Sequence, residues 1–466
     1  MTSTAQARTI GELRKSGYQV LPVRDELRNN LIKKIRSEEI VFPGIIGFDD
    51  TVIPQLENAL LAGQDVILLG ERGQAKSRLI RSLVTLLDET IPKIAGCEIN
   101  DNPFDPICRG CRDRVADLGD ETEIDWISRD ERYSEKLATP DISIADLIGE
   151  VDPIKVAEGR HLSDELAIHY GLVPRTNRGI FSINELPDLA ERIQVGLFNL
   201  MEERDVQIKG YRIRLPLDVY VVATANPEDY TNRGRIVTPL KDRYGAQIHT
   251  HYPRHIEEEI TIMDQERAKF PEEENLVIPN FMKEITAEIT AQARHSNEIN
   301  QRSGVSVRVS IANYETLLSN AVRRSIRSRE QLACPRISDL PYIMASFGGK
   351  IELETFEEGR EGRVMEDLTK RAVLRVFGQY FDINELDDTV TAFDLGNVAE
   401  TGSEKPSTDY PELTRRVEGL GAAVSQLTDD TRPEVMASAV EFVLEGLHLN
   451  RRLNCERVGH DYRYHR

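Results

Sequence analysis

The stretch LLGERGQAKSR, residues 68–78, decides how the fold is interpreted. Gly70, four further residues, Ala75, Lys76 and Ser77 follow the spacing G-x-x-x-x-G-K-[ST] of a phosphate-binding loop, with alanine in place of the second glycine. Such a loop binds an anion because successive backbone N–H groups and a helix N-terminus point at it. We expect Ala75 to lie where the chain is already entering the helix, with a negative φ, so that its methyl group causes no strain.

The residues around this loop predict a parallel α/β sheet. The apolar run DVILLG (65–70) is typical of a buried strand that ends in the loop. Three more buried strands are expected at 179–186, 219–227 and 246–253, with an amphipathic helix at 188–204. Helices between such strands predict a sheet covered on both faces.

Two irregular inserts and a helical second half complete the expected organisation. Residues 150–179 form the first insert, and VQIKGYRIRL (206–215) predicts a β-hairpin around Lys209-Gly210. Residues 398–411 resemble a linker, and Thr431 with Glu434 resembles a capping box at the start of a helix. The expected divisions are a helical N-terminal segment (1–40), an α/β nucleotide-binding domain (41–255), an all-α lid (256–350) and a helical C-terminal extension (351–466).

Bulk composition excludes several function classes. The 466 residues carry a net charge of −20, which argues against direct binding of nucleic acid. No apolar run approaches the ~20 residues that a membrane span needs, and the first residues lack the apolar core of a secretory signal. Five cysteines fit a reducing compartment, so we expect a cytoplasmic protein.

Polar residues follow two of the expected strands. Asn184 and Glu185 end the second strand, where phosphoryl-transfer ATPases usually have Asp-Glu. We expect Glu185 to polarise the attacking water and Asn184 to accept a hydrogen bond from a water on Mg²⁺, with Ser77 as a direct Mg²⁺ ligand. Asn226, after the third strand, would orient the water or touch the γ-phosphate.

Two arginines are candidates for sensing or completing the site. Arg243, in PLKDRYGA, would stabilise charge on a neighbouring subunit's γ-phosphate, although an ion pair with Asp242 or another surface acid is the alternative. Arg308, in GVSVRVS, would cap the phosphates from the lid, although an ordinary surface arginine at a helix start is the alternative.

In order, GERGQAKS, IFSINE, ATANP, LKDRYG and VSVRVS resemble the AAA+ ATPases, and within them the magnesium-chelatase I subunit and its MoxR-type relatives. The resemblance covers roughly residues 40–350. It implies a base-side segment containing Ile45, Ile46 and Gly47. It also implies a phosphate loop formed by consecutive residues: Gly70, Glu71, Arg72, Gly73, Gln74, Ala75, Lys76, Ser77 and Arg78.

The same resemblance implies ATP and Mg²⁺ as cofactors and a ring, usually of six subunits, with ATP between neighbours. The family remodels or loads a partner, often one with a von Willebrand A domain. In magnesium chelatase the porphyrin site belongs to a different, large subunit, so the resemblance does not assign a porphyrin to this chain.

Three functions are compatible with these residues. The first is an active ATPase motor. The second is a structural ring subunit that hydrolyses little, because Ala75 and Asn184 depart from the motifs. The third is a transcription activator of alternative-sigma-factor polymerase, whose contact loop would begin near LIGEVDP. The G-A-F-T-G-A loop of those proteins is absent, and no helix-turn-helix stands out in the C-terminal part.

Cys97, Cys108 and Cys111 lie close together in CEINDNPFDPICRGCR. The C-x-x-C spacing is typical of metal ligands, but a structural zinc site needs four, and the fourth would have to come from elsewhere. The alternative is a set of thiols packed in a loop.

Overall fold

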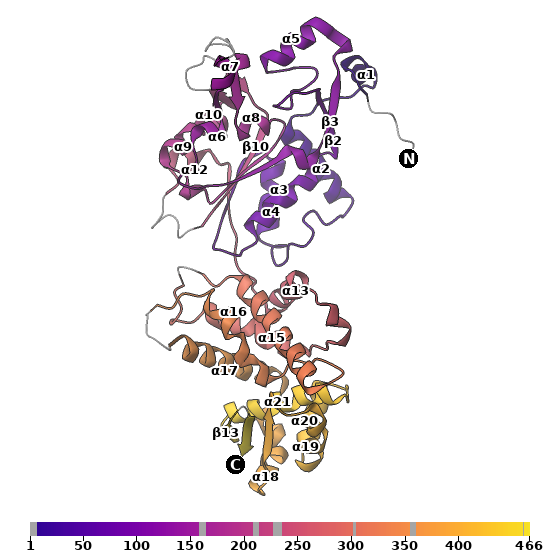
Figure 1. Ribbon diagram of the computed structural model, residues 1–466, viewed down its shortest axis with the longest axis vertical. Coiled ribbons are helices and arrows are strands. Elements are labelled where there is room, and N and C mark those ends of the chain that lie inside the picture. The colour runs from indigo at the N-terminus through magenta and orange to yellow at the C-terminus, as the bar shows by residue number, and fades with distance from the viewer. Residues whose placement is uncertain are drawn as a thin grey trace. The chain divides into compact units, whose positions relative to one another are not determined.

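The computed structural model describes residues 7–157, 165–207, 214–226, 235–301, 304–354, 360–459 and 461–466. The chain divides into two compact units, Met1–His251 and Tyr252–Arg466. Figure 1 shows the first unit in indigo to magenta and the second in orange to yellow. No helix in these ranges is long and apolar enough to cross a membrane.

A five-stranded parallel sheet forms the centre of the first unit, in the order β11-β1-β10-β7-β4. Its strands are β1 (Val66–Leu69), β4 (Tyr133–Leu137), β7 (Gly179–Asn184), β10 (Val219–Ala225) and β11 (Ala246–His249). Four of these strands are those predicted from the sequence. The fifth, β4, was not predicted, because its sequence YSEKL is polar and lies half-exposed at an edge of the sheet.

Both faces of the sheet are buried, as the sequence predicted. Alternate residues of β1 enter different cores: Ile67 and Leu69 pack into one, and Val66 and Leu68 into the other.

The helices of this unit are α1 (Ile10–Lys15), α2 (Val23–Arg36), α3 (Val52–Leu61), α4 (Lys76–Ser82), α5 (Arg109–Leu118), α6 (Ile144–Leu147), α7 (Pro153–Ala157), α8 (Leu172–Arg175), α9 (Glu191–Gly196), α10 (Phe198–Glu202) and α12 (Thr238–Arg243). The helix expected at 188–204 is thus two short helices, α9 and α10.

Three antiparallel pairs of strands extend this unit. They are β2 (Thr90–Ile94) with β3 (Ile124–Ser128), β5 (Gly149–Val151) with β6 (Ile168–Tyr170), and β8 (Asp205–Gln207) with β9 (Arg214–Pro216). The last pair confirms the hairpin predicted at 206–215, although its turn at Lys209-Gly210 lies outside the described residues.

A buried ion pair fixes the edge strand β4. The guanidinium of Arg132, directly before β4, donates to both carboxylate oxygens of Glu26 on α2, at 2.8 and 2.6 Å. The two side chains are 1% and 4% exposed. Arg132 also donates to the carbonyl of Arg178, directly before β7, so the pair joins α2 to the starts of two strands.

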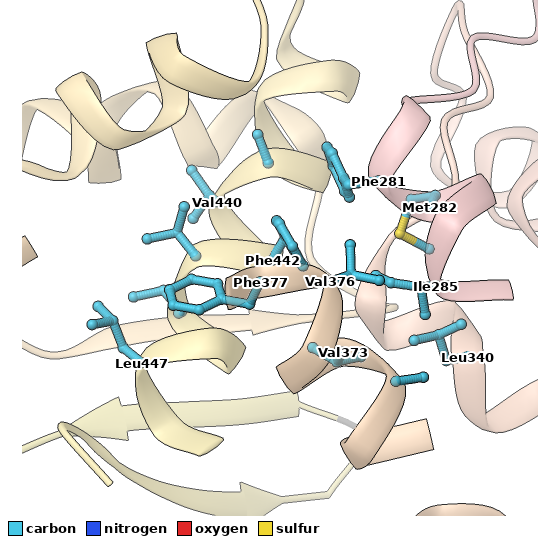
Figure 2. Close-up of a cluster of buried hydrophobic side chains, with 14 of the residues drawn as sticks. Phe281, Met282, Ile285, Leu340, Val373, Val376, Phe377, Val440, Phe442 and Leu447 are labelled. Atoms are coloured by element: carbon cyan, nitrogen blue, oxygen red, sulfur yellow. The ribbon is translucent and has the colours of Figure 1, made fainter. Parts of the chain in front are cut away.

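The second unit is mainly helical. Its helices are α13 (Ile256–Glu266), α14 (Asn280–Arg294), α15 (Val307–Ser328), α16 (Met344–Gly348), α17 (Arg360–Tyr380), α18 (Asp387–Asp394), α19 (Tyr410–Arg416), α20 (Leu420–Leu427) and α21 (Pro433–Leu449). Phe281, Phe377 and Phe442 meet in its core (Figure 2), with the rings of Phe281 and Phe442 stacked 4.6 Å apart.

Two expectations for the C-terminal part are wrong. Residues 398–411 are not a linker: they contain β12 (Ala399–Gly402), which pairs with β14 (Asp461–His465) beside β13 (Asn454–Val458), and Tyr410 is only 2% exposed. The capping box at Thr431 and Glu434 does not form, because α21 begins at Pro433 with Arg432 as its cap.

Candidate functional site

The predicted phosphate loop and the predicted polar residues follow neighbouring strands at one edge of the sheet. Leu69 of β1 lies opposite Ala225 of β10, and the backbone N–H of Gly70 donates to the carbonyl of Ala225 at 3.1 Å. Ala223 of β10 lies opposite Ile183 of β7. The carboxyl ends of these strands therefore bring the loop, Asn226 and Asn184 to one edge, which is where ligands bind in open α/β sheets.

Gly70 is required by its surroundings. A Cβ at this position would strike the hydroxyl of Thr250 and the amide oxygen of Gln74. Gln74 is buried, and its amide oxygen accepts from the backbone N–H of Glu71 at 3.1 Å and from the Thr250 hydroxyl at 2.7 Å. Thr250 follows β11, so the sheet itself holds the loop in shape, a contact that the sequence did not indicate.

Ala75 does not have the backbone that the sequence led us to expect. Its φ is 52° and its ψ is 13°, in the left-handed region, because it is the N-cap of α4 and not yet a helical residue. A non-glycine residue costs about 1–2 kcal/mol in this conformation. Glycine at position 75 would thus adopt this left-handed conformation without strain, whereas alanine leaves the backbone of the loop strained.

Lys76 and Ser77 open α4 directly after this turn. The Lys76 ammonium donates to the carbonyl of Gly70 and, at 2.6 Å, to that of Glu71, so it folds over its own loop. Ser77 and Arg81 are four residues apart and share one face of α4. Arg72 and Arg78, two other residues of the predicted loop, are exposed.

Asn184 contacts a carboxylate that the sequence analysis did not single out. Its side-chain amide donates to Glu135 on β4, and its amide oxygen lies 3.5 Å from the hydroxyl of Thr224, which donates to it. The guanidinium of Arg81 donates to both oxygens of Glu135, at 2.8 and 2.9 Å. These bonds from Arg81 are the main reason why the pKa of Glu135 lies below its usual value, so the carboxylate is ionised at neutral pH.

Glu185 and Asn226 lie beside this group. Glu185 has a φ of 55°, and its backbone N–H donates to the hydroxyl of Thr224 at 3.0 Å. Asn226 is 5% exposed and directly follows β10. Thr224 therefore binds both Asn184 and Glu185, and fixes how β7 ends.

The chain directly after the expected base-side segment contacts the end of β11. Ile45 is buried, and Gly47 has a φ of 78°. The hydroxyl of Thr51, at the end of this segment, lies 2.8 Å from the Nε2 atom of His251, whose ring also packs on Phe48. His251 follows Thr250, the residue that holds the loop.

The two candidate arginines have different surroundings. Arg243 at the end of α12 donates to the carboxylate of Glu202 and lies over the ring of Phe198 at 4.7 Å, with 26% of its side chain exposed. The ion-pair alternative is therefore present, with Glu202 as the partner. Arg308 is an exposed residue in the first turn of α15, in the second unit.

The first unit has the fold of a P-loop α/β domain and the second unit is mainly helical, two features that are typical of AAA+ proteins. The chain is homologous to the I subunits of magnesium chelatase. It is 28% identical over 250 residues to the chloroplastic magnesium-chelatase subunit ChlI-2 of Arabidopsis thaliana, covering 51% of this chain and 56% of that protein. It is 27% identical over 268 residues to subunit ChlI of Nostoc sp., covering 55% and 65%.

The matched region thus spans between about half and two thirds of these curated relatives. No protein-family model matches the chain. Among solved structures, the complex between subunits BchI and BchD of magnesium chelatase is similar at 21% identity, with a TM-score of 0.36, covering 71% of this chain and 99% of that one.

Proposed function

We propose that the chain binds ATP with Mg²⁺ at the carboxyl edge of the first unit's sheet, hydrolyses it, and acts as a motor subunit of a ring. The observation that carries this proposal is the meeting of the phosphate loop with Asn184, Glu185 and Asn226 at one edge. The homology to magnesium-chelatase I subunits supports the same function.

The residues at this edge fit the phosphates of ATP. Gly70 leaves room for the contacts of Thr250 and Gln74 that shape the loop, and the Lys76 ammonium would turn from the loop carbonyls toward the terminal phosphates. Ser77, Asn184 and the ionised Glu135 offer the oxygen atoms that Mg²⁺ prefers. When bound, Mg²⁺ would neutralise the charge of the phosphates.

We propose that the Glu135 carboxylate takes the role of the aspartate that ATPases usually have at the position of Asn184. Asn184 brings no charge, but its side-chain amide donates to the Glu135 carboxylate. Arg81 holds this carboxylate in place, and it lies on the same face of α4 as Ser77. The pair Asn184–Glu135 thus brings a carboxylate next to position 184, although Arg81 balances its charge until a cation binds. Glu185 would accept the proton of the attacking water, and Asn226 would orient that water.

Ring formation and a partner are part of the proposal. Arg243 is partly exposed on α12 and would complete a neighbour's site after leaving Glu202. Arg308 would contact the phosphates from the second unit. A partner with a von Willebrand A domain would be the target of the ring.

One experiment tests the motor function. We would measure Mg²⁺-dependent ATP turnover by the full chain over a range of protein concentrations, together with Lys76→Ala, Arg243→Ala and Arg235→Ala. Arg235 is a matched control, since it is a surface arginine paired with Glu191 and 75% exposed. Turnover per subunit should rise with concentration, and should be lost in the first two variants only. Turnover that survives Lys76→Ala would refute the assignment of the site.

The second candidate function is a ring subunit that binds ATP and hydrolyses little. The left-handed backbone at Ala75 and the uncharged Asn184 favour it. In that case the double variant Asn184→Asp with Glu135→Gln, which exchanges the carboxylate and the amide, should raise turnover sharply. Unchanged turnover would count against this candidate.

A further inference from the structure

The three cysteines of residues 97–111 meet a fourth ligand in the folded chain, Asp101. The sulfur atoms of Cys97, Cys108 and Cys111 and a carboxylate oxygen of Asp101 all lie within 4.8 Å of one another. In a tetrahedral zinc site with 2.3 Å metal–sulfur bonds, the sulfur atoms lie about 3.8 Å apart. The four groups are therefore close to the spacing that one metal ion requires.

Local structure brings these residues together. Cys97 follows β2, and the chain turns at Asn100, which has a φ of 53°, so that the carbonyl of Asp101 accepts from the N–H of Ile94 at 3.3 Å. Cys108 is the N-cap of α5, and Cys111 lies in the first turn of that helix. The site thus joins the end of β2 to the start of α5, in the part of the first unit that Figure 1 labels β2, β3 and α5.

Backbone N–H groups already bind the ligand atoms. The sulfur of Cys97 accepts from the N–H of Asp101, and that of Cys108 accepts from the N–H of Cys111, both at 3.4 Å. The two carboxylate oxygens of Asp101 accept from the N–H groups of Ile107 and Cys108, at 3.2 and 3.1 Å. Such bonds orient ligands and stabilise thiolates, and they are typical of the surroundings of metal sites.

The charge of Asp101 needs a cation. Asp101 is 0% exposed, and no ion pair within the described ranges includes it. The nearby ammonium of Lys93 donates instead to the carbonyl of Cys97 and to the side chain of Asn100. A buried carboxylate beside three thiols without a cation is unfavourable, and a bound metal ion would remove that cost.

We infer that Cys97, Asp101, Cys108 and Cys111 bind one Zn²⁺ ion in a structural site. Three thiolates and a carboxylate form a soft tetrahedral set that suits Zn²⁺, and four protein ligands leave no position open for a substrate. The ion fastens α5 to the end of β2, which pairs antiparallel with β3. This inference is independent of ATP binding, because none of the four residues belongs to the phosphate loop.

The test begins with the metal content of the purified full chain, measured by mass spectrometry after dialysis against Zn²⁺ and then against metal-free buffer. We expect about one zinc per chain. The double variant Cys108→Ser with Cys111→Ser should lose it, and Cys334→Ser, a buried cysteine of the second unit, should keep it. A zinc-free wild-type chain, a double variant that retains zinc, or a Cys108–Cys111 disulfide in the native protein would each overturn the inference.

A second variant, which should gain a spectroscopic signal, distinguishes loss of metal ligands from misfolding of the double variant. We would replace zinc with Co²⁺ and record the thiolate-to-cobalt charge-transfer absorption of the wild type and of Asp101→Cys. If Asp101 is the fourth ligand, the variant adds a fourth thiolate and intensifies this absorption while the tetrahedral visible bands remain. An unchanged charge-transfer band would show that Asp101 does not bind the metal.

Discussion

Asn184→Asp should destabilise the first unit, although it restores the residue that phosphoryl-transfer ATPases usually have. The amide of Asn184 donates to Glu135, and a carboxylate in its place would face the Glu135 carboxylate at hydrogen-bond range. Two such charges about 4 Å apart repel by about 4 kcal/mol at an effective dielectric constant of 20. Because Glu135 is 21% exposed and paired with Arg81, we expect a net loss of about 2–3 kcal/mol in the free energy of unfolding.

The assay is urea unfolding followed by the fluorescence of Trp126. This is the only tryptophan of the chain, and it lies on β3, so it reports on the first unit alone. Adding Glu135→Gln to Asn184→Asp should restore most of the lost stability, because the glutamine amide can donate to the new carboxylate. The loss should also shrink at low pH, since one carboxyl group then becomes protonated. A single variant as stable as the wild type, or a double variant less stable than the single one, would refute the reasoning.

Three further predictions concern the same unit. Ala75→Gly should stabilise it by about 1 kcal/mol, because glycine adopts the left-handed backbone without strain. The control Ala62→Gly, at a position with a φ of −83°, should not stabilise it, and urea unfolding of both variants compares them. Glu26→Gln should cost about 3 kcal/mol in the same assay, since it leaves the buried Arg132 charge without its partner, and a loss below ~1 kcal/mol would contradict this. Because the pKa of Glu135 is lowered in the folded chain, this residue adds stability above the usual pKa of glutamate and loses it as the pH falls through the folded value. The wild type should therefore have a higher free energy of unfolding than Glu135→Gln at neutral pH but not in acid. A difference that is the same at neutral and acid pH would contradict this reasoning.

Much of the fold could be read from the sequence because its signals are local. Buried parallel strands are continuous apolar runs, so β1, β7, β10 and β11 were recognisable one by one. The phosphate loop could be predicted for a similar reason, since its glycines, lysine and serine lie within eight consecutive residues. The start of α15, placed near Arg308 by the sequence, lies at Val307.

Signals that depend on partners far along the chain were missed. The strand β4 is polar, and only its pairing with β7 and the buried Glu26–Arg132 pair make it part of the sheet. The linker predicted at 398–411 failed in the same way, because its turn-forming residues gave no sign that β14, some sixty positions later, would pair with β12.

By itself, the sequence was enough to predict the class of the site: a phosphate loop followed by polar residues at the ends of buried strands. Only the tertiary structure decided the details that control its chemistry. The backbone at Ala75 is left-handed because the residue caps α4, and a hydrogen bond across two strands places Glu135 next to Asn184. Asp101 likewise joins the three cysteines through a turn whose shape the residue spacing did not reveal. The spacing of residues along the chain does not show which side chains the fold brings into contact. It also does not show which backbone conformation each residue adopts, because both depend on distant parts of the chain.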